Sequence, residues 1–176
     1  VSADLEDGFG ASPEACADTV IRACTIGLVG GSIEDATGDP AKPIYDLNHS
    51  VERIEAAAEA TRGLPFLLTA RAENFLWGRP DLTDTIRRLH AFEEAGAEVL
   101  YAPGLPDIEA IRTVCAEVGK PVNVVMGLNG PTYSVAELTD AATEVMNEGT
   151  FRYASDGMPG RELADLMVQD KESDRR

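Results

Sequence analysis

Short apolar runs alternate with longer amphipathic segments along most of the chain. The runs are rich in Val, Leu, Ile and Ala and predict strands at residues 1–6, 27–33, 65–70, 99–102 and 121–126. The segments between them predict helices. One begins after Ser12, which is a suitable N-cap before Pro13, and the others lie at residues 48–62, 82–95 and 107–118.

The predicted strands are almost continuously apolar and are separated by helices. This pattern is typical of parallel strands whose two faces are both covered. Five successive strand–helix units predict an α/β protein. They are compatible with an open doubly wound sheet or with part of a (β/α)8 barrel.

Polar side chains collect where three successive predicted strands end. Active sites are built at the carboxyl ends of parallel strands in both candidate architectures. Charged residues at a single strand end are usually only solvated, but their repetition at three strands favours a site. The residues are Asp4, Glu6 and Asp7, then Glu34 and Asp35, then Arg71, Glu73 and Asn74.

The acids at the first two strand ends suit a hard cation. In an extended strand Asp4 and Glu6 point to the same face, and Glu34 adds a third carboxylate from the next strand. Three carboxylates without His or Cys predict a site for Mg²⁺, or alternatively Mn²⁺. Gly8 and Gly10 allow the following loop to turn sharply or to approach a ligand, and we include both as candidate substrate-binding residues.

Arg71 is the candidate anchor for a carboxylate or phosphonate group, because its planar guanidinium binds two oxygens at once. Glu73 is expected to hold Arg71 or to take part in proton transfer. Asn74 is expected to support the substrate, and Asn123 is a further candidate at the end of another strand. The two histidines, His49 and His90, lie in helical patterns and are expected at the surface.

The length of the chain and its net charge limit the number of domains and the kinds of partner that we expect. The 176 residues suit one domain, predicted at residues 1–168, with a disordered tail at 169–176. The net charge of −16 argues against a nucleic-acid partner, and no apolar run is long enough to span a membrane. Three cysteines without a metal or disulfide spacing indicate reduced thiols and a cytoplasmic protein. The chain starts at Val1, inside a strand-like run, and is expected to lack an N-terminal portion.

Four ordered motifs resemble the isocitrate lyase and phosphoenolpyruvate mutase superfamily, in particular its carboxyvinyl-carboxyphosphonate phosphorylmutase-like subgroup. The likeness covers most of residues 1–139 and resumes at 148–151. The motifs are SADLEDGFG (2–10), GGSIED (30–35), LTARAENF (68–75) and AGAEVLYAPG (95–104).

The resemblance implies a (β/α)8 barrel that binds Mg²⁺ through Asp4, Glu6 and Glu34, often with water between. The family commonly has Asp where Glu6 stands. The resemblance also implies that Arg71 contacts the substrate, a small carboxylate or phosphonate. The implied reaction makes or breaks a C–C or P–C bond of an α-keto or α-hydroxy acid through a metal-stabilised enolate, in a homo-oligomer.

Three departures from the family bear on activity. The loop at residues 36–46 contains no Cys or His, although isocitrate and methylisocitrate lyases carry a catalytic loop with both at this place. The chain also begins at what resembles the third barrel strand, and the eighth strand is not evident. The implied enzyme is a lyase or phosphonomutase. The alternative is a non-catalytic remnant or interaction module that keeps the sheet without turnover.

Overall fold

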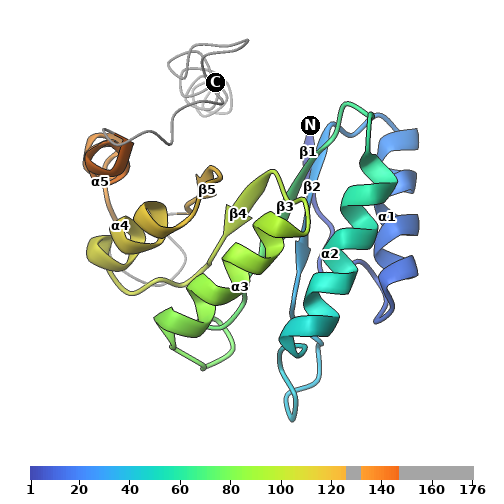
Figure 1. The fold of residues 1–176 in the computed structure, drawn as a ribbon, viewed down its shortest axis with the longest axis horizontal. Coiled ribbons are helices and arrows are strands. Elements are labelled where there is room, and N and C mark those ends of the chain that lie inside the picture. The colour runs from blue at the N-terminus through green and yellow to red at the C-terminus, as the bar shows by residue number, and fades with distance from the viewer. Residues whose placement is uncertain (126–131, 147–176) are drawn as a thin grey trace, which may run out of the picture.

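The computed structural model describes residues 1–125 and 132–146 (Figure 1). The predicted tail, the end of the predicted domain and the family-like segment at 148–151 lie outside these residues. The elements in chain order are β1 (Ser2–Asp4), α1 (Pro13–Thr25), β2 (Gly30–Glu34), α2 (Leu47–Thr61), β3 (Leu67–Arg71), α3 (Leu82–Glu94), β4 (Val99–Tyr101), α4 (Ile108–Glu117), β5 (Val122–Asn123) and α5 (Val135–Met146).

The five strands form one parallel sheet in the order β1-β2-β3-β4-β5. The sequential order distinguishes between the two architectures that the sequence left open. A doubly wound sheet reverses its strand order at a switch point, whereas neighbours in the wall of a (β/α) barrel follow the chain. The helices likewise contact their neighbours in sequence along the sheet (Figure 1). The described strands therefore form a segment of barrel wall.

Side-chain caps fix the starts of the first four helices. The Ser12 hydroxyl accepts a hydrogen bond from the Ala15 amide at 3.3 Å, which confirms the predicted cap. Aspartate carboxylates do the same for α2, α3 and α4. These acceptors satisfy amides that have no partner within the helix. The three aspartates are Asp46, Asp81 and Asp107.

The hydrophobic core lies between the sheet and its helices. Ile33, Leu68 and Leu100 point to the helix side and are fully buried among helical residues such as Val20 and Phe92. The opposite face of the sheet is more open. The Leu67 residue of β3, for example, is 56% exposed. Alternation along each strand therefore gives one face to the core and the other to polar groups near the strand ends.

Strand β1 is shorter than predicted. It ends at Asp4, and Glu6 has a positive φ of 49°, so the extended backbone expected through residue 6 does not continue. Helix α5 is an addition, because the sequence pattern predicted no element there. Among the described helices, none is long and apolar enough to cross a membrane. The three cysteines, Cys16, Cys24 and Cys115, are free thiols.

Candidate functional site

The sheet register brings the candidate residues of neighbouring strands side by side. Glu34 of β2 pairs in register with Arg71 of β3, and Arg71 pairs with Tyr101 of β4. Asn123 of β5 is next to Tyr101, and Asp4 of β1 lies two residue pairs lower, beside Ser32. Since all five strands are parallel, these residues share the carboxyl edge of the sheet.

Arg71 is the centre of this group. Its Nη1 lies 2.7 Å from Asp4 Oδ2 and 2.9 Å from Glu34 Oε1, and its Nε donates to Glu73 Oε1 at 2.8 Å. Three segments, which follow or end three successive strands, thus supply carboxylates to one guanidinium. The Asp4 side chain is 58% exposed, whereas that of Glu73 is 2% exposed, so the cluster has an open side at Asp4 and a closed side at Glu73.

Burial and charge act against each other in this cluster. Burial alone would lower the pKa of Arg71, but the charges of Glu73, Glu34 and Asp4 outweigh it and raise the pKa. Burial raises the pKa of Glu73 to about 7, despite the opposing charge of Arg71. Burial also raises the pKa of Glu34, and the negative charges of Asp4 and Glu6 add to this shift. The arginine therefore stays charged while the acids around it share a strongly negative environment.

Asp4 and Glu34 converge as predicted, but Glu6 does not join them in a direct contact. The Glu6 amide donates to Asp4 Oδ1 at 3.0 Å, and the turn that this bond stabilises takes Glu6 out of the strand alternation. Its backbone carbonyl accepts from the Glu34 amide at 2.8 Å. The expectation that Asp4 and Glu6 share one face of an extended strand is wrong, because the strand has already ended.

Gly8 and Gly10 turn toward helix α1. A Cβ at Gly8, which has a φ of 76°, would lie 2.7 Å from Cys16 Sγ, and a Cβ at Gly10 would lie 2.7 Å from Ala15 Cβ. Both glycines therefore allow a sharp turn and a close approach to a helix. Their contact with substrate stays a prediction.

Arg53 of α2 holds the same loop from the other side. Arg53 is only 1% exposed, and its guanidinium donates to the carbonyls of Gly10 and Asp7. The guanidinium also stacks on the Tyr45 ring, with 4.5 Å between Cζ and the ring centroid. His49, predicted as a surface residue, is partly buried and its Nε2 lies 2.8 Å from the Ala11 carbonyl. His90 is exposed, as predicted.

Sequence reasoning missed two groups at this edge. Tyr101 lies under Arg71, with 5.1 Å between the guanidinium carbon and the ring centroid. Arg88 of α3 reaches Asp35 and Asp84 in a buried network. Tyr101 lies near the end of the strand predicted at residues 99–102 and is the last residue of β4, so its position could have identified it. Arg88 and Asp84 form an (i, i+4) charge pair, which on sequence grounds is typical of a solvated helix surface.

Asn74 belongs to that network. It is 1% exposed, its amide group donates to Asp84 Oδ2 at 2.8 Å, and its Oδ1 has no hydrogen-bond partner. Asn123 is half-buried at the edge beside Tyr101. The structure therefore places Asn123 at the same edge, and it ties Asn74 to a neighbouring helix.

The loop at residues 36–46 folds back on itself. Ala36 and Ile44 form an antiparallel bridge, the Thr37 amide donates to the Pro43 carbonyl at 2.9 Å, and Ile44 is buried. Asp39 accepts from the Ala41 amide at 2.9 Å. The loop is thus a compact turn, and it brings no Cys or His to the site.

The acids suit a hydrated ion better than direct coordination by three carboxylates. Within residues 1–125 and 132–146, no three His, Cys, Asp or Glu side chains come close enough to hold one metal ion. Asp4 and Glu34 nevertheless share a single cationic partner, Nη1 of Arg71. Two carboxylates that already share a positive charge fit Mg²⁺, which usually keeps several of its waters.

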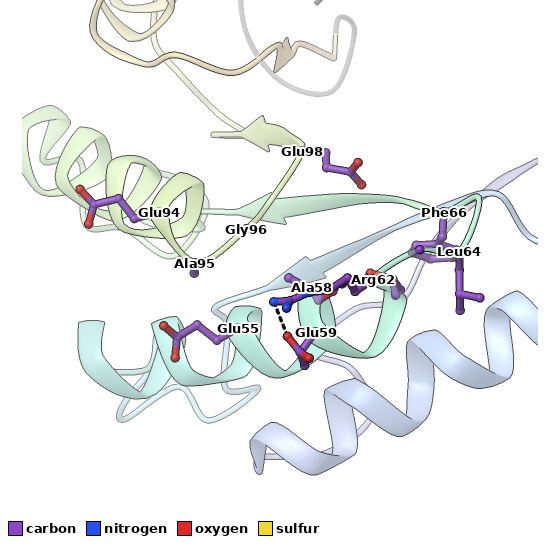
Figure 2. A pocket seen from close by; sticks show the side chains of 12 residues that line it. Glu55, Ala58, Glu59, Arg62, Leu64, Phe66, Glu94, Ala95, Gly96 and Glu98 are labelled. Carbon is purple, nitrogen blue, oxygen red and sulfur yellow. Dashed lines mark hydrogen bonds and ion pairs between the residues drawn. The ribbon is translucent and has the colours of Figure 1, made fainter.

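A hollow of the described structure lies at the other end of the sheet (Figure 2). It has a volume of about 660 Å³, and Leu64, Phe66 and Glu98, which line it, immediately precede β3 and β4. Figure 2 shows Arg62 turned toward Glu59, with which it forms an ion pair. We place the chemistry at the carboxyl edge instead, because the polar cluster and the buried charges are there.

Comparisons with known proteins identify relatives of this chain. The chain is 30% identical to the 2-methylisocitrate lyase of Escherichia coli K12 over 146 residues, which cover 78% of this chain and 49% of that enzyme. A solved structure from Burkholderia cenocepacia J2315, provisionally described as a lyase/mutase, is 47% identical with a TM-score of 0.78. The match covers 96% of this chain and 69% of that one.

A third protein, 2,3-dimethylmalate lyase, is a member of the PEP mutase/isocitrate lyase superfamily. It is 25% identical with a TM-score of 0.71, and the match covers 98% of this chain and 71% of that one. A phosphonopyruvate hydrolase solved with oxalate and Mg²⁺ is 18% identical with a TM-score of 0.59, so it shows the shared fold alone. The parallel sheet is therefore part of the barrel of this superfamily.

The chain spans about half the length of the curated relatives that it matches, between 49% and 56% for the first three. The family model described as phosphoenolpyruvate phosphomutase matches residues 1–156. This range includes every candidate residue at the carboxyl edge. The chain accordingly belongs to the phosphoenolpyruvate phosphomutase family, as its four motifs indicated.

Proposed function

We propose that this chain carries the active edge of a Mg²⁺-dependent lyase or phosphonomutase. Its substrate is a small α-keto or α-hydroxy carboxylic acid, in which a C–C or P–C bond is made or broken. The observation that carries the proposal is Arg71, a buried arginine held by Asp4, Glu34 and Glu73 at the edge where this fold places its chemistry. The lyase and mutase activities of its relatives support the same class of reaction.

Asp4 and Glu34 would hold the ion, in part through water, and Glu6 would add negative charge from the neighbouring turn. When bound, Mg²⁺ supplies Lewis-acid stabilisation of the enolate. The electrostatic influence of Asp4 and Glu6 on Glu34 supports this assignment, because three acids near one point are stabilised by a cation.

Arg71 would bind the substrate carboxylate or phosphonate. Its Nε and Nη1 are engaged by carboxylates, while Nη2 has no acceptor among the described residues and is left for an anion. Tyr101 supports the guanidinium plane from below. An anion bound there would accept from the N–H groups of Nη2, while the carboxylates hold Nε and Nη1 in place.

Glu73 would orient Arg71, since its carboxylate accepts from Nε at 2.8 Å. A pKa of about 7 also suits proton transfer near neutral pH. Gly8, Gly10, Asn74 and Asn123 complete the proposed substrate surroundings. We place the enzyme in the cytoplasm as a homo-oligomer, in accordance with its free thiols and its family.

The second candidate is a non-catalytic module that keeps the sheet without turnover. The compact loop at residues 36–46 favours it, because that loop offers no side chain equivalent to the Cys and His of the isocitrate and methylisocitrate lyases. Under this alternative the cluster around Arg71 binds anions or metal without turnover.

Calorimetric titration with Mg²⁺ and then oxalate tests the proposed site. We expect saturable binding of Mg²⁺ to the full chain, and binding that is at least about tenfold weaker in Asp4→Ala, because one of two carboxylates is lost. Asp39→Ala removes an equal charge from an exposed loop and is expected to bind like the wild type. Equal binding by Asp4→Ala and the wild type would remove Asp4 from the site.

An activity screen then separates the two candidate functions. Oxaloacetate, phosphonopyruvate and 2-methylisocitrate represent the C–C and P–C substrates, each assayed with Mg²⁺ and with Mn²⁺. Turnover that is lost in Arg71→Lys supports the enzyme. Metal and oxalate binding without turnover of any α-keto or α-hydroxy acid favours the non-catalytic module.

A further inference from the structure

Arg88 is a buried arginine on helix α3 that contacts two other parts of the chain. Its residue exposure is only 5%. Nη1 lies 3.0 Å from Asp35 Oδ2 and also donates to the Tyr45 carbonyl at 3.1 Å. Nε donates to Asp84 Oδ2 at 2.9 Å, one turn earlier on the same helix. The guanidinium therefore joins α3 to the end of β2 and to the loop that follows it.

The two acids that Arg88 holds are themselves bound to the segment after β3. Asp35 Oδ1 accepts the backbone amide of Glu73 at 2.8 Å. Asp84 Oδ2 accepts the side-chain amide of Asn74 at 2.8 Å. Glu73 and Asn74 follow Arg71 directly along the chain. The network thus fixes the turn that brings the Glu73 carboxylate back onto Arg71 Nε.

Because Asp35 and Glu73 are buried, losing any of their contacts would be costly. Asp35 is 3% exposed and Glu73 is 1% exposed, so neither carboxylate has water to replace a lost partner. Asp84 stays charged near neutral pH. Burial would raise its pKa, but hydrogen bonds from Arg88, Asn74 and Arg87 lower it to about 2. Arg88 is therefore the cation that allows two acids to serve as fixed acceptors.

We propose that Arg88 is a positioning residue for the anion-binding Arg71. It holds Asp35, Asp35 fixes the Glu73 backbone, and Glu73 orients the Arg71 guanidinium. The inference rests on the proposed function only where it assigns Arg71 to a substrate anion. The relay of contacts itself is a property of the folded chain.

A lysine cannot replace this arginine. Arg88 uses two nitrogens on different sides of a planar fork to reach Asp84 and Asp35. A single ammonium group keeps the charge but not the two directions. Arg88→Lys is therefore the informative variant. Arg87→Lys is the matched control, since Arg87 is exposed and binds the outer oxygen of Asp84 without reaching Asp35.

NMR of the full chain tests the relay without any substrate. The Glu73 amide donates to one acceptor among the described residues, the Asp35 side chain of the neighbouring strand–helix unit. We expect its hydrogen exchange in the wild type to be slowed by at least about a hundredfold relative to an unprotected amide. In Arg88→Lys we expect faster exchange and a shifted Arg71 Nε–H signal, with neither change in Arg87→Lys. Rapid exchange of the Glu73 amide in the folded wild type would overturn the proposal.

Loss of stability alone would not produce this pattern. Val114→Ala removes buried methyl groups from α4 at a site outside the network and serves as a destabilised reference. Its Glu73 amide and Arg71 Nε–H signals are expected to match the wild type. A folded Arg88→Lys that also keeps both signals at their wild-type positions contradicts the relay. If Arg88→Lys does not fold, Asp35→Asn replaces it, because that variant breaks the same link between Arg88 and the Glu73 amide. If neither variant folds, the rate of hydrogen exchange of the Glu73 amide in the wild type decides the proposal.

Oxalate binding in the presence of Mg²⁺ then connects the relay to function. We expect Arg88→Lys to bind oxalate about tenfold more weakly than Arg87→Lys, because Nη2 of a misaligned Arg71 loses part of its contact with the anion. Equal affinities would overturn the functional part of the proposal. Absence of oxalate binding in the wild type would instead contradict the proposed function, while the NMR signals would still report on the relay.

Discussion

Glu73 is a fully buried acid at the carboxyl edge. It is 1% exposed and carries an ion pair with Arg71, yet its pKa rises from 4.5 to about 7. Burial is the largest cause, and the charge of Glu34 adds to it. The attraction of Arg71 is too small to compensate, because Arg71 is shared with two other acids. The charge of Glu73 is therefore maintained at a cost in folding free energy.

The pH dependence of stability follows from this pKa. The folded state retains the Glu73 proton up to about pH 7, whereas the unfolded chain releases it near pH 4.5. Stability from this group is complete below pH 4.5 and is lost as the pH rises through 7. We expect the free energy of unfolding to fall by up to about 3 kcal/mol between pH 5 and pH 8.

Chemical denaturation at several pH values measures this slope. Glu73→Gln cannot ionise but can still accept a hydrogen bond from Arg71, so its slope should be flatter across the same range. Glu117→Gln, an exposed acid on α4, should keep the wild-type slope. A wild-type slope that Glu73→Gln leaves unchanged would show that another group titrates.

Gly8 lies where the loop after β1 packs tightly against helix α1. Its φ of 76° disfavours any side chain, and a Cβ would meet Cys16 Sγ at 2.7 Å and Cys16 Cα at 3.3 Å. Gly8→Ala should lower the free energy of unfolding by about 2 to 4 kcal/mol. Gly38 has nearly the same φ, 74°, in open space, so Gly38→Ala should lose only about 1 kcal/mol. Equal losses in denaturant titrations would contradict a steric role for helix α1.

The sequence indicated the acids and the arginine at the strand ends because position along a parallel strand is a local signal. Asp4, Glu34 and Arg71 were predicted to converge, and they do. Glu6 was not placed correctly, because a single left-handed residue ended the strand alternation. Arg88 was missed, since a charge pair on a helix gives no sign of which face is buried.

At the scale of elements, local chemistry was sufficient for most boundaries. Helices α2, α3 and α4 begin and end within one residue of the predicted limits, because an aspartate cap precedes each first turn. Strand ends were less predictable, since the pairing of β1 and β5 with a neighbour, not their own apolar residues, limits their length. Helix α5 follows the last predicted strand, at residues 121–126, but the sequence pattern predicted no helix after that strand.

The N-cap of helix α3 connects the stability of an element to the candidate site. Asp81 accepts the Asp84 amide at 3.0 Å and so orders the first turn, where Asp84 holds Asn74 and Arg88. Asp81→Ala should lower the free energy of unfolding by about 1 kcal/mol, and Asp81→Asn, which keeps an acceptor, by a few tenths at most. Urea denaturation followed by circular dichroism compares the two. A loss as large in Asp81→Asn would mean that charge, not capping, stabilises the turn.

At the scale of the whole molecule, two properties combine. The sequential sheet order brings charged residues from three strands to one edge, and the chain carries 31 acidic against 15 basic residues. Most ion pairs among the described residues join side chains three or four positions apart in the chain, and each such pair contributes little to stability. The acids at the edge are different, because they are gathered by the fold and meet one arginine. The surface acids therefore repel one another over long range, while the acids at the carboxyl edge are stabilised by a nearby positive charge.

Salt and Mg²⁺ separate these two contributions. Raising NaCl from about 10 mM to 100 mM shortens the screening length from about 30 Å to 10 Å, so the melting temperature of the wild type should rise through reduced repulsion. Mg²⁺ at matched ionic strength should add more, because it binds the folded edge. At tenfold excess over its dissociation constant the gain is about 1.4 kcal/mol, or about 3 °C for a chain of this size.

Two single-charge variants identify the origin of the additional rise. Glu34→Gln removes a proposed ligand, whereas Glu117→Gln removes the same charge from an exposed position on α4. Both should keep the response to NaCl, since the net charge of −16 changes by only one in each. The additional rise with Mg²⁺ should persist in Glu117→Gln and disappear in Glu34→Gln. If scanning calorimetry gives the same additional rise in both, Mg²⁺ acts on the general acidity of the surface and not at the edge that Arg71 organises.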